Sequence, residues 1–259
     1  IAKFMDRKLP YELDYKTLKK LRSYETVLLY ANIIIPLILA AANKYNWEFL
    51  FSVLEILNIV TLVSYAILYI LTEIFIQPKT SGKRRKGFLD NSLGSKLLDS
   101  EVKGYYDNDE LKVGPYKLLV NCFENCFFTK SIIQRMHVTV VCKNLILVLI
   151  MIIFSYYGYK DNMFTLPILQ LFLSSAFIIE LCYHFSFYAK LSQLYNNFID
   201  IFSSHRTKDE ITQQAFLMVI EYETTLAYNK SNISDKIYNK INEQLTKEWE
   251  QIKTRYGIK

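Results

Sequence analysis

A few ionisable and amide side chains interrupt four long apolar runs, and these residues are the ones best placed to do chemistry. Glu55 and Asn58 lie about one helical turn apart in the second run, and Gln170 lies at a similar depth in the fourth run. Such groups are costly inside a bilayer and usually face a bundle interior or water. Acidic side chains line cation-conducting pores, so Glu55, Asn58 and Gln170 are candidate pore-lining residues. The competing interpretation is a closed bundle in which Glu55 hydrogen-bonds to Asn58 or Gln170.

Lys143 of the third run and Glu180 of the fourth run form a second polar layer. This layer lies nearer the ends of the runs that adjoin the middle segment and the tail. Opposite charges inside a membrane protein tend to pair with one another, because an isolated charge is poorly solvated there. We therefore expect Lys143 and Glu180 to form an intramembrane ion pair with a structural role.

Between the second and third runs the sequence combines a dense basic cluster with aromatic and amide side chains. Stacking rings, amide groups and cations are the parts that hold a nucleotide or a short single strand. The candidate ligand-binding residues are Lys83, Arg84, Arg85, Lys86, Tyr105, Tyr106, Asn121, Asn125 and Arg135. The alternative is that residues 83–86 only anchor the topology or contact lipid headgroups, which is the commoner role of a basic cluster beside a span.

The apolar runs themselves comprise residues 27–42, 49–71, 138–157 and 163–187. A bilayer core of about 30 Å needs roughly 20 apolar helical residues, and three of the runs reach that length. The first run is shorter, but only six residues separate it from the second. The runs are continuous rather than alternating, which argues against an outer-membrane barrel. The sequence therefore predicts an all-α membrane protein with four transmembrane helices arranged as two hairpins.

The distribution of Lys and Arg sets the predicted orientation. Seven lie in the first 26 residues, eleven between residues 77 and 137, and ten after residue 187, whereas each hairpin loop contains one. Because cytoplasmic loops are enriched in Lys and Arg, both termini and the middle segment are expected in the cytoplasm. The predicted division is a cytoplasmic N-terminus (1–26), a transmembrane hairpin (27–76), a cytoplasmic middle (77–137), a second transmembrane hairpin (138–187) and a mostly helical cytoplasmic tail (188–259).

Local signals refine the cytoplasmic segments. Pro78 is expected to end the second transmembrane helix. In the tail, Ser234 is a candidate N-cap for a final helix whose apolar stripe recurs every three or four residues and includes Leu245 and Trp249. This stripe must be covered, and two covers remain open: the other cytoplasmic segments of the same chain, or another subunit.

Catalysis finds little support in the sequence. No zinc-binding H-E-x-x-H, phosphate-binding glycine loop or G-x-S-x-G nucleophile motif is present, and the three histidines are scattered. Cys122 and Cys126 lie one helical turn apart, but no second Cys or His pair lies nearby to complete a zinc site. We therefore expect no enzymatic activity, no bound metal and no cofactor.

Several short stretches, together with the layout of two hairpins, a long middle segment and a helical tail, carry a family resemblance. They are Gly-Tyr-Tyr-Asp-Asn at 104–108, Asn-Cys-Phe-Glu-Asn at 121–125, and the tail from Ile-Glu-Tyr-Glu at 220–223 to Leu-Thr-Lys-Glu-Trp at 245–249. In these features the chain resembles the SMODS-associated four-transmembrane effectors of bacterial antiphage systems, of the CBASS or Hailong type.

The resemblance implies a homo-oligomeric pore, such as a tetramer, in the bacterial inner membrane. It implies that a nucleotidyltransferase encoded nearby makes the cyclic nucleotide or single-stranded oligonucleotide that controls the pore, and that opening depolarises and kills an infected cell. A non-conducting membrane anchor whose helical tail recruits a cytoplasmic partner is the alternative from a different class. A small transporter would call for an internal repeat, and the two hairpins show no convincing sequence similarity.

Overall fold

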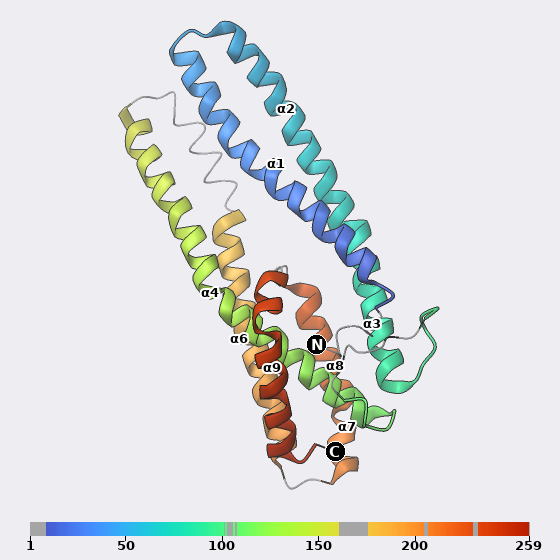
Figure 1. The fold of residues 1–259 in the computed structure, drawn as a ribbon. Helices are drawn as coiled ribbons and strands as arrows, with labels where there is room; N and C mark the ends of the chain where they lie inside the picture. Colours follow the sequence, from blue (N-terminus) through green and yellow to red (C-terminus); the bar gives the residue numbers. More distant parts are fainter. Residues whose placement is uncertain are drawn as a thin grey trace. The chain divides into compact units, whose positions relative to one another are not determined.

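The computed structural model of the chain describes residues 9–100, 102, 106, 108–160, 176–204, 207–229 and 233–258. Every regular element within these ranges is a helix, which confirms the predicted all-α fold (Figure 1). The chain divides into two compact units. The hairpin unit comprises Tyr11–Arg84 and Leu145–Phe177, and the helical unit comprises Ile1–Pro10, Arg85–Asn144 and Ile178–Lys259.

Helices α1 (Glu12–Lys44) and α2 (Glu48–Ile70) form an antiparallel pair in the hairpin unit (Figure 1). The short turn between them satisfies the end of α1, because the backbone N–H of Trp47 donates to the carbonyl oxygen of Ala42 at 2.9 Å. Asn46 in this turn has a φ of 53°, a left-handed conformation that asparagine adopts more readily than most residues. The pair is thus closed by a turn whose backbone is hydrogen-bonded to the helix that precedes it.

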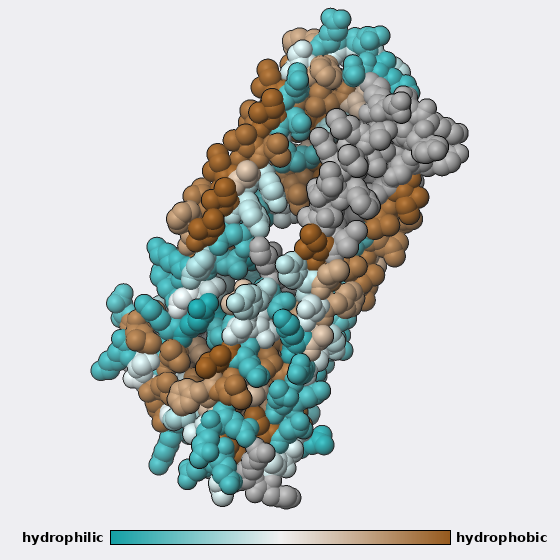
Figure 2. Space-filling model, turned by 180° about the vertical axis from the view of Figure 1, so that it is seen from behind, coloured by the Kyte–Doolittle hydropathy of each residue, from teal (hydrophilic) through white to brown (hydrophobic). Residues whose placement is uncertain are grey.

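Both helices of this pair carry apolar side chains on their outer surface (Figure 2). The helices Glu12–Lys44 and Glu48–Leu93 contain 18-residue windows with mean hydropathies of 1.9 and 2.1, of which only 17% and 11% are buried. The core helix of a water-soluble protein would bury most of such a window. These two helices are long and apolar enough to cross a membrane.

The count of four membrane spans stays a prediction. The predicted span 138–157 lies within α4 (Pro115–Lys160). Of the predicted span 163–187, residues 163–175 lie outside the described part of the chain, and the remainder lies in α6 (Ala176–Ser203). Helix formation in the described parts of both runs is consistent with the predicted second hairpin, whereas the passage of these runs through a membrane is supported by the sequence alone.

The helix does not end at Pro78, contrary to the prediction. A π-helical segment, η2 (Leu71–Ile76), follows α2 and leads directly into α3 (Gln77–Leu93). A proline inside an α-helix clashes with the carbonyl group four residues earlier. In η2 the wider turn changes the register just before Pro78, since the N–H of Gln77 donates to the carbonyl of Thr72, five residues back. The helix therefore continues through the proline.

The described part of the helical unit's core is supplied by six helices. They are α3, which contributes Phe88, and α4 and α6 together with α7 (Lys208–Gln213), α8 (Ala215–Tyr228) and α9 (Asp235–Tyr256). Buried apolar residues recur at helical spacing along α4, α6, α8 and α9 and join one common cluster. Figure 1 shows these segments, distant in the sequence, running beside one another.

Phe123 on α4 lies at the centre of this cluster and is fully buried. Its ring stacks on Phe198 and Phe202 of α6 at centroid distances of 5.0 and 5.4 Å, and it meets Trp249 of α9 edge-on at 5.2 Å. Aromatic pairs at such distances contribute about 0.5–1.5 kcal/mol beyond their burial. A single ring therefore joins three helices.

The apolar stripe of α9 is covered by the same chain. Ile241, Leu245 and Trp249 are at most 8% exposed and belong to the common cluster. Ser234 is the N-cap, as predicted, and its hydroxyl oxygen accepts a hydrogen bond from the N–H of Ile237 at 3.4 Å. The sequence left open whether the same chain or another subunit covers this stripe, and for these three residues the structure shows the same chain.

A buried polar network ties a loop to this core. Asn108 donates through Nδ2 to Asn121 Oδ1 at 2.8 Å and to Glu124 Oε2 at 2.6 Å, and its Oδ1 accepts from the indole N–H of Trp249 at 3.2 Å. Asn121 in turn donates to Ser92 Oγ on α3 at 2.9 Å. Because buried polar groups are stable only when hydrogen-bonded, the network fixes the loop of Asn108 against α3, α4 and α9.

We expect Asn108→Ala to lower the free energy of unfolding by about 2–4 kcal/mol, because Glu124 and the Trp249 indole lose a buried partner. The measurement is thermal unfolding of the full chain in detergent, followed by tryptophan fluorescence. Asn239→Ala, at an exposed position of α9, is the matched control and should change stability by less than about 0.5 kcal/mol. Equal effects of the two variants would contradict a stabilising role for the network.

Candidate functional site

The α1–α2 hairpin carries a row of polar side chains along the line where its helices meet. This polar seam consists of Arg22, Glu25, Asn32, Asn58, Thr61, Tyr65, Thr72 and Glu73, all of them buried or half-buried. Many apolar side chains of the same helices are exposed, including Ile56 at 65% and Ile59 at 58%. Polar residues inside and apolar residues outside are the arrangement expected of a helix pair in lipid.

Asn32 and Thr61 join the two helices near the middle of the seam. The hydroxyl of Thr61 donates to Asn32 Oδ1 at 2.9 Å, and Asn32 Nδ2 donates to the carbonyl oxygen of Thr61 at 3.4 Å. Hydrogen bonds between helices in apolar surroundings stabilise a pair by about 0.6–2 kcal/mol. Asn32 and Thr61 therefore satisfy each other's hydrogen-bonding groups in the middle of the seam.

Charged groups close the seam near the start of α1. Arg22 Nη2 donates to Glu73 Oε1 at 3.2 Å and also to the side-chain oxygen of Gln77. A second ion pair joins Lys83 Nζ to Asp14 at 2.6 Å. These contacts fix the first turns of α1 against η2 and α3, so both charges of each pair have a partner.

Of the seam residues, only Asn58 is among the functional candidates predicted from the sequence. The spacing of several others along the sequence nevertheless contains a signal. Glu25 and Asn32 are seven residues apart, and Asn58, Tyr65 and Thr72 follow one another at intervals of seven. A seven-residue repeat keeps side chains on the line where two packed helices meet. A polar heptad within apolar runs therefore predicts a helix–helix contact.

The predicted pore-lining residues occupy different environments. Asn58 is half-buried on the seam, whereas Glu55 is exposed on the apolar outer surface of α2. No described residue forms a hydrogen bond or an ion pair with Glu55. Gln170 lies outside the described residues. Within the described hairpin, Glu55 is thus a carboxylate on a surface that is otherwise suited to lipid.

Lys143 of α4 and Glu180 of α6 are brought together. The ammonium nitrogen of Lys143 lies 2.8 and 2.6 Å from the two carboxylate oxygens of Glu180. The two side chains are 38% and 43% exposed, so the pair lies at the surface of its two helices rather than in the core. Its position inside the membrane stays a prediction.

The basic cluster does not form one cationic surface. Lys83 pairs with Asp14, whereas the Nε of Arg85 lies 3.2 Å from Glu223 Oε2 on α8. Successive residues of a helix point about 100° apart, so four neighbours diverge. Arg84 is half-buried, and Lys86 is exposed.

Two of the other predicted ligand-binding residues belong to the core rather than to a surface. Asn121 is fully buried in the Asn108 network, and Tyr106 is only 3% exposed and packs against Phe88 at a ring distance of 6.1 Å. The half-buried Asn125 donates to the Tyr106 hydroxyl at 3.3 Å. Tyr105 lies outside the described residues.

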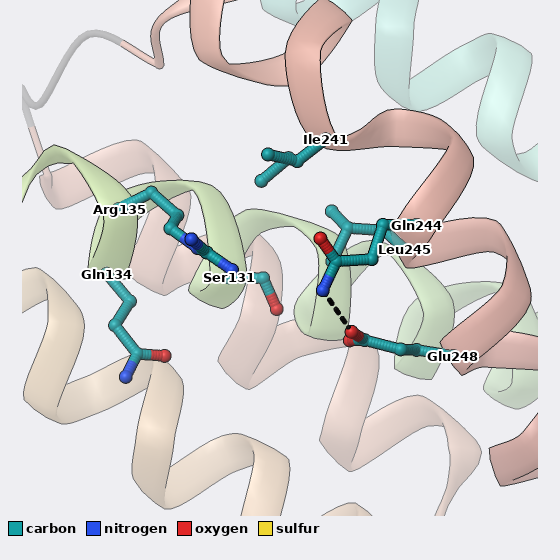
Figure 3. Close-up of a pocket in the computed structure, with 7 residues that line it drawn as sticks. All are labelled: Ser131, Gln134, Arg135, Ile241, Gln244, Leu245 and Glu248. Atoms are coloured by element: carbon teal, nitrogen blue, oxygen red, sulfur yellow. Dashed lines mark hydrogen bonds between the residues drawn. The ribbon is translucent and has the colours of Figure 1, made fainter.

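Arg135 is exposed on α4 and lines a cavity of about 100 Å³ between α4 and α9 (Figure 3). Ser131 and Gln134 line it from the same helix, while Gln244 and Glu248 face them from α9 and share a hydrogen bond of 2.7 Å. Pockets for drug-sized ligands measure about 300–1,000 Å³. The cavity is therefore too small to enclose a nucleotide.

The cysteine pair lies in the core of the helical unit. Cys122 and Cys126 are fully buried, and burial raises the pKa of the Cys126 thiol to about 12. That thiol is protonated at neutral pH and is a poor nucleophile or metal ligand. Among the described residues, no group of three His, Cys, Asp or Glu side chains is arranged to hold a metal ion.

We expect Thr61→Val to weaken the hairpin by about 0.6–2 kcal/mol, because it removes the hydroxyl that bonds to Asn32 while keeping the side-chain shape. Thermal unfolding in detergent measures the loss. Thr26→Val is the matched control, since the Thr26 hydroxyl donates to the Arg22 carbonyl within its own helix. A loss as large in the control would show that the contact between the helices adds nothing.

Comparison of the chain with protein-family models, with curated proteins and with solved structures finds no match. Its function must therefore be inferred from its own residues and geometry.

Proposed function

We propose that this chain forms a homo-oligomeric pore in a membrane, with Glu55 facing the water-filled path. The proposal is supported by one observation above all: an exposed carboxylate on a helix that is long and apolar enough to cross a membrane. A charged side chain facing lipid is costly, by about 2.5 kcal/mol or more at the bilayer centre and by less toward the surfaces. Glu55 lies seven residues, or about 10 Å, from the start of α2. Several hairpins around one axis would remove Glu55 from lipid and set its carboxylates in a ring, as in cation pores.

Control of the pore by a nucleotide rests on the family resemblance. In this part of the proposal a nucleotidyltransferase makes the signal, and the signal shifts the pore between closed and open states by binding one of them more tightly. Lys86 and Arg135 are exposed cations of the candidate set in the helical unit, and both are accessible to phosphate groups.

The alternative, a non-conducting anchor that recruits a partner, is favoured by a different observation. Helix α8 buries one face in the core, but it exposes Phe216, Leu217 and Ile220 by 56%, 58% and 62%. Clustered apolar residues on a packed helix often mark a surface where another protein binds. The anchor hypothesis predicts that the reconstituted protein passes no current.

We expect Glu55→Gln to lower cation conductance and cation selectivity, because the amide has the same shape without the charge. Planar bilayers with the purified full chain and a potassium chloride gradient measure both quantities. Glu48→Gln, which removes an exposed charge from the first turn of the same helix, should leave both unchanged. Unchanged selectivity in Glu55→Gln would exclude Glu55 from the path, and absence of current from the wild type would favour the anchor.

We expect Lys86→Glu combined with Arg135→Glu to weaken binding of a fluorescent cyclic dinucleotide or a short single-stranded oligonucleotide. For a single strand, each lost phosphate contact makes the salt dependence weaker: the negative slope of log affinity against log salt concentration becomes smaller in magnitude by about 0.7. Lys240→Glu combined with Lys247→Glu, at two exposed positions of α9, changes the net charge by the same amount and is the control. Binding that is equal in the double variant and the control would contradict a role of these two cations in holding the ligand.

A further inference from the structure

Two histidines meet directly between α4 and α6. His137 Nδ1 lies 2.8 Å from His184 Nε2, and the ring centroids are 4.9 Å apart. His184 is only 1% exposed, and His137 is half-buried. The rings of Phe185 and Tyr188 pack against His137 at 5.1 and 4.6 Å. Two titratable imidazoles therefore share one hydrogen bond in aromatic surroundings.

The second nitrogen of His184 indicates which ring donates. This buried Nδ1 has no hydrogen-bond partner among the described residues. A neutral imidazole has one N–H donor and one bare acceptor nitrogen. A buried N–H without an acceptor is rarer in proteins than a buried acceptor without a donor. His184 therefore donates from Nε2 to the bare Nδ1 of His137.

Protonation of either ring is unfavourable in this arrangement. In His184 the added proton must go to the buried Nδ1, where no described acceptor lies. In His137 a proton on Nδ1 sets two N–H donors against each other at 2.8 Å. The charged groups beside the pair are Glu180, one helical turn before His184, and Lys143, which already pairs with that carboxylate. Tyr188 is a further titratable neighbour, and among the described residues no carboxylate without a partner lies beside the pair to compensate a new charge.

We propose that His137 and His184 form a pH-sensitive latch that holds α4 against α6 while both rings are neutral. The released state binds protons that the latched state excludes, so acidification favours release. Release begins as the pH falls below about 6.5, the ordinary pKa of histidine. For each proton taken up, the ratio of released to latched protein rises about tenfold per pH unit below that value.

The position of the latch gives its release a structural consequence. His137 directly precedes the predicted span 138–157, and His184 lies three residues before the end of the predicted span 163–187. Both histidines belong to helices that are anchored in the core through Phe123 and Phe198. Acidification would therefore separate α4 from α6 just beyond that anchor, while the aromatic core stays packed.

The test compares acid sensitivity with and without the latch. Thermal unfolding of the full chain in detergent is measured at about pH 7.5 and about pH 5, on either side of the ordinary histidine pKa. His137→Gln keeps a hydrogen-bond acceptor but cannot take up a proton. His205→Gln removes the third histidine of the chain and is the matched control.

We expect the wild type and His205→Gln to lose stability on acidification, with an unfolding equilibrium constant that rises about tenfold per pH unit for each proton taken up. His137→Gln retains only the proton of His184, so its unfolding constant should rise about tenfold less per pH unit than that of the wild type. Equal acid sensitivity in all three proteins overturns the latch. A measurement without substitution is nitrogen NMR of histidine-labelled wild type at about pH 7.5, above the ordinary pKa. It should find His184 protonated on Nε2 and bare on Nδ1, and a protonated Nδ1 also overturns the proposal.

Discussion

A polar group on a helix that crosses a membrane has no water to satisfy it. The α1–α2 hairpin, whose helices are long and apolar enough to cross one, has the arrangement that this constraint predicts. Its polar side chains meet along one seam, where Asn32 and Thr61 bond to each other and Arg22 bonds to Glu73. Lipid chains are as apolar as leucine, so they supply no hydrophobic force between helices. Polar contacts and close packing must hold the pair, and the apolar residues are left on the outside.

The helical unit follows the opposite rule. The ring of Phe123 is fully buried among aromatic neighbours, and Asn108 is buried only together with partners for both ends of its amide. Here water drives apolar groups inward, and polar groups enter the core only when they are hydrogen-bonded. One chain thus contains two parts with inverse surfaces, which explains why 51% hydrophobic and 22% charged residues describe neither part well.

Features set by neighbours in the sequence were predictable, and features set by distant partners were mostly not. The Ser234 cap follows from local chemistry, and the pairing of Lys143 with Glu180 follows from counting residues along two antiparallel runs. Pro78 misled because a preceding π-turn lets the helix continue, and residue type does not reveal that turn. Asn121 has the chemistry of a ligand-binding residue, but its amide is engaged by partners about 13 to 30 residues away, which no local pattern shows. The seven-residue spacing of polar residues in the hairpin is visible in the sequence. It predicts a contact between two helices more directly than it predicts a pore.

Glu55 is the exception to the rule that governs its own hairpin. The charges of Arg22 and Glu73 pair across the seam, whereas Glu55 is exposed on α2 and has no partner among the described residues. A charged carboxylate in apolar surroundings is unfavourable unless it contacts water or another polar group. In the proposed pore, other copies of the chain supply the water and the partners that the described part of the hairpin does not offer to Glu55. Within the described hairpin, Glu55 is therefore the exposed carboxylate on which the proposed assembly rests, and a pore would supply it with water as well as protein.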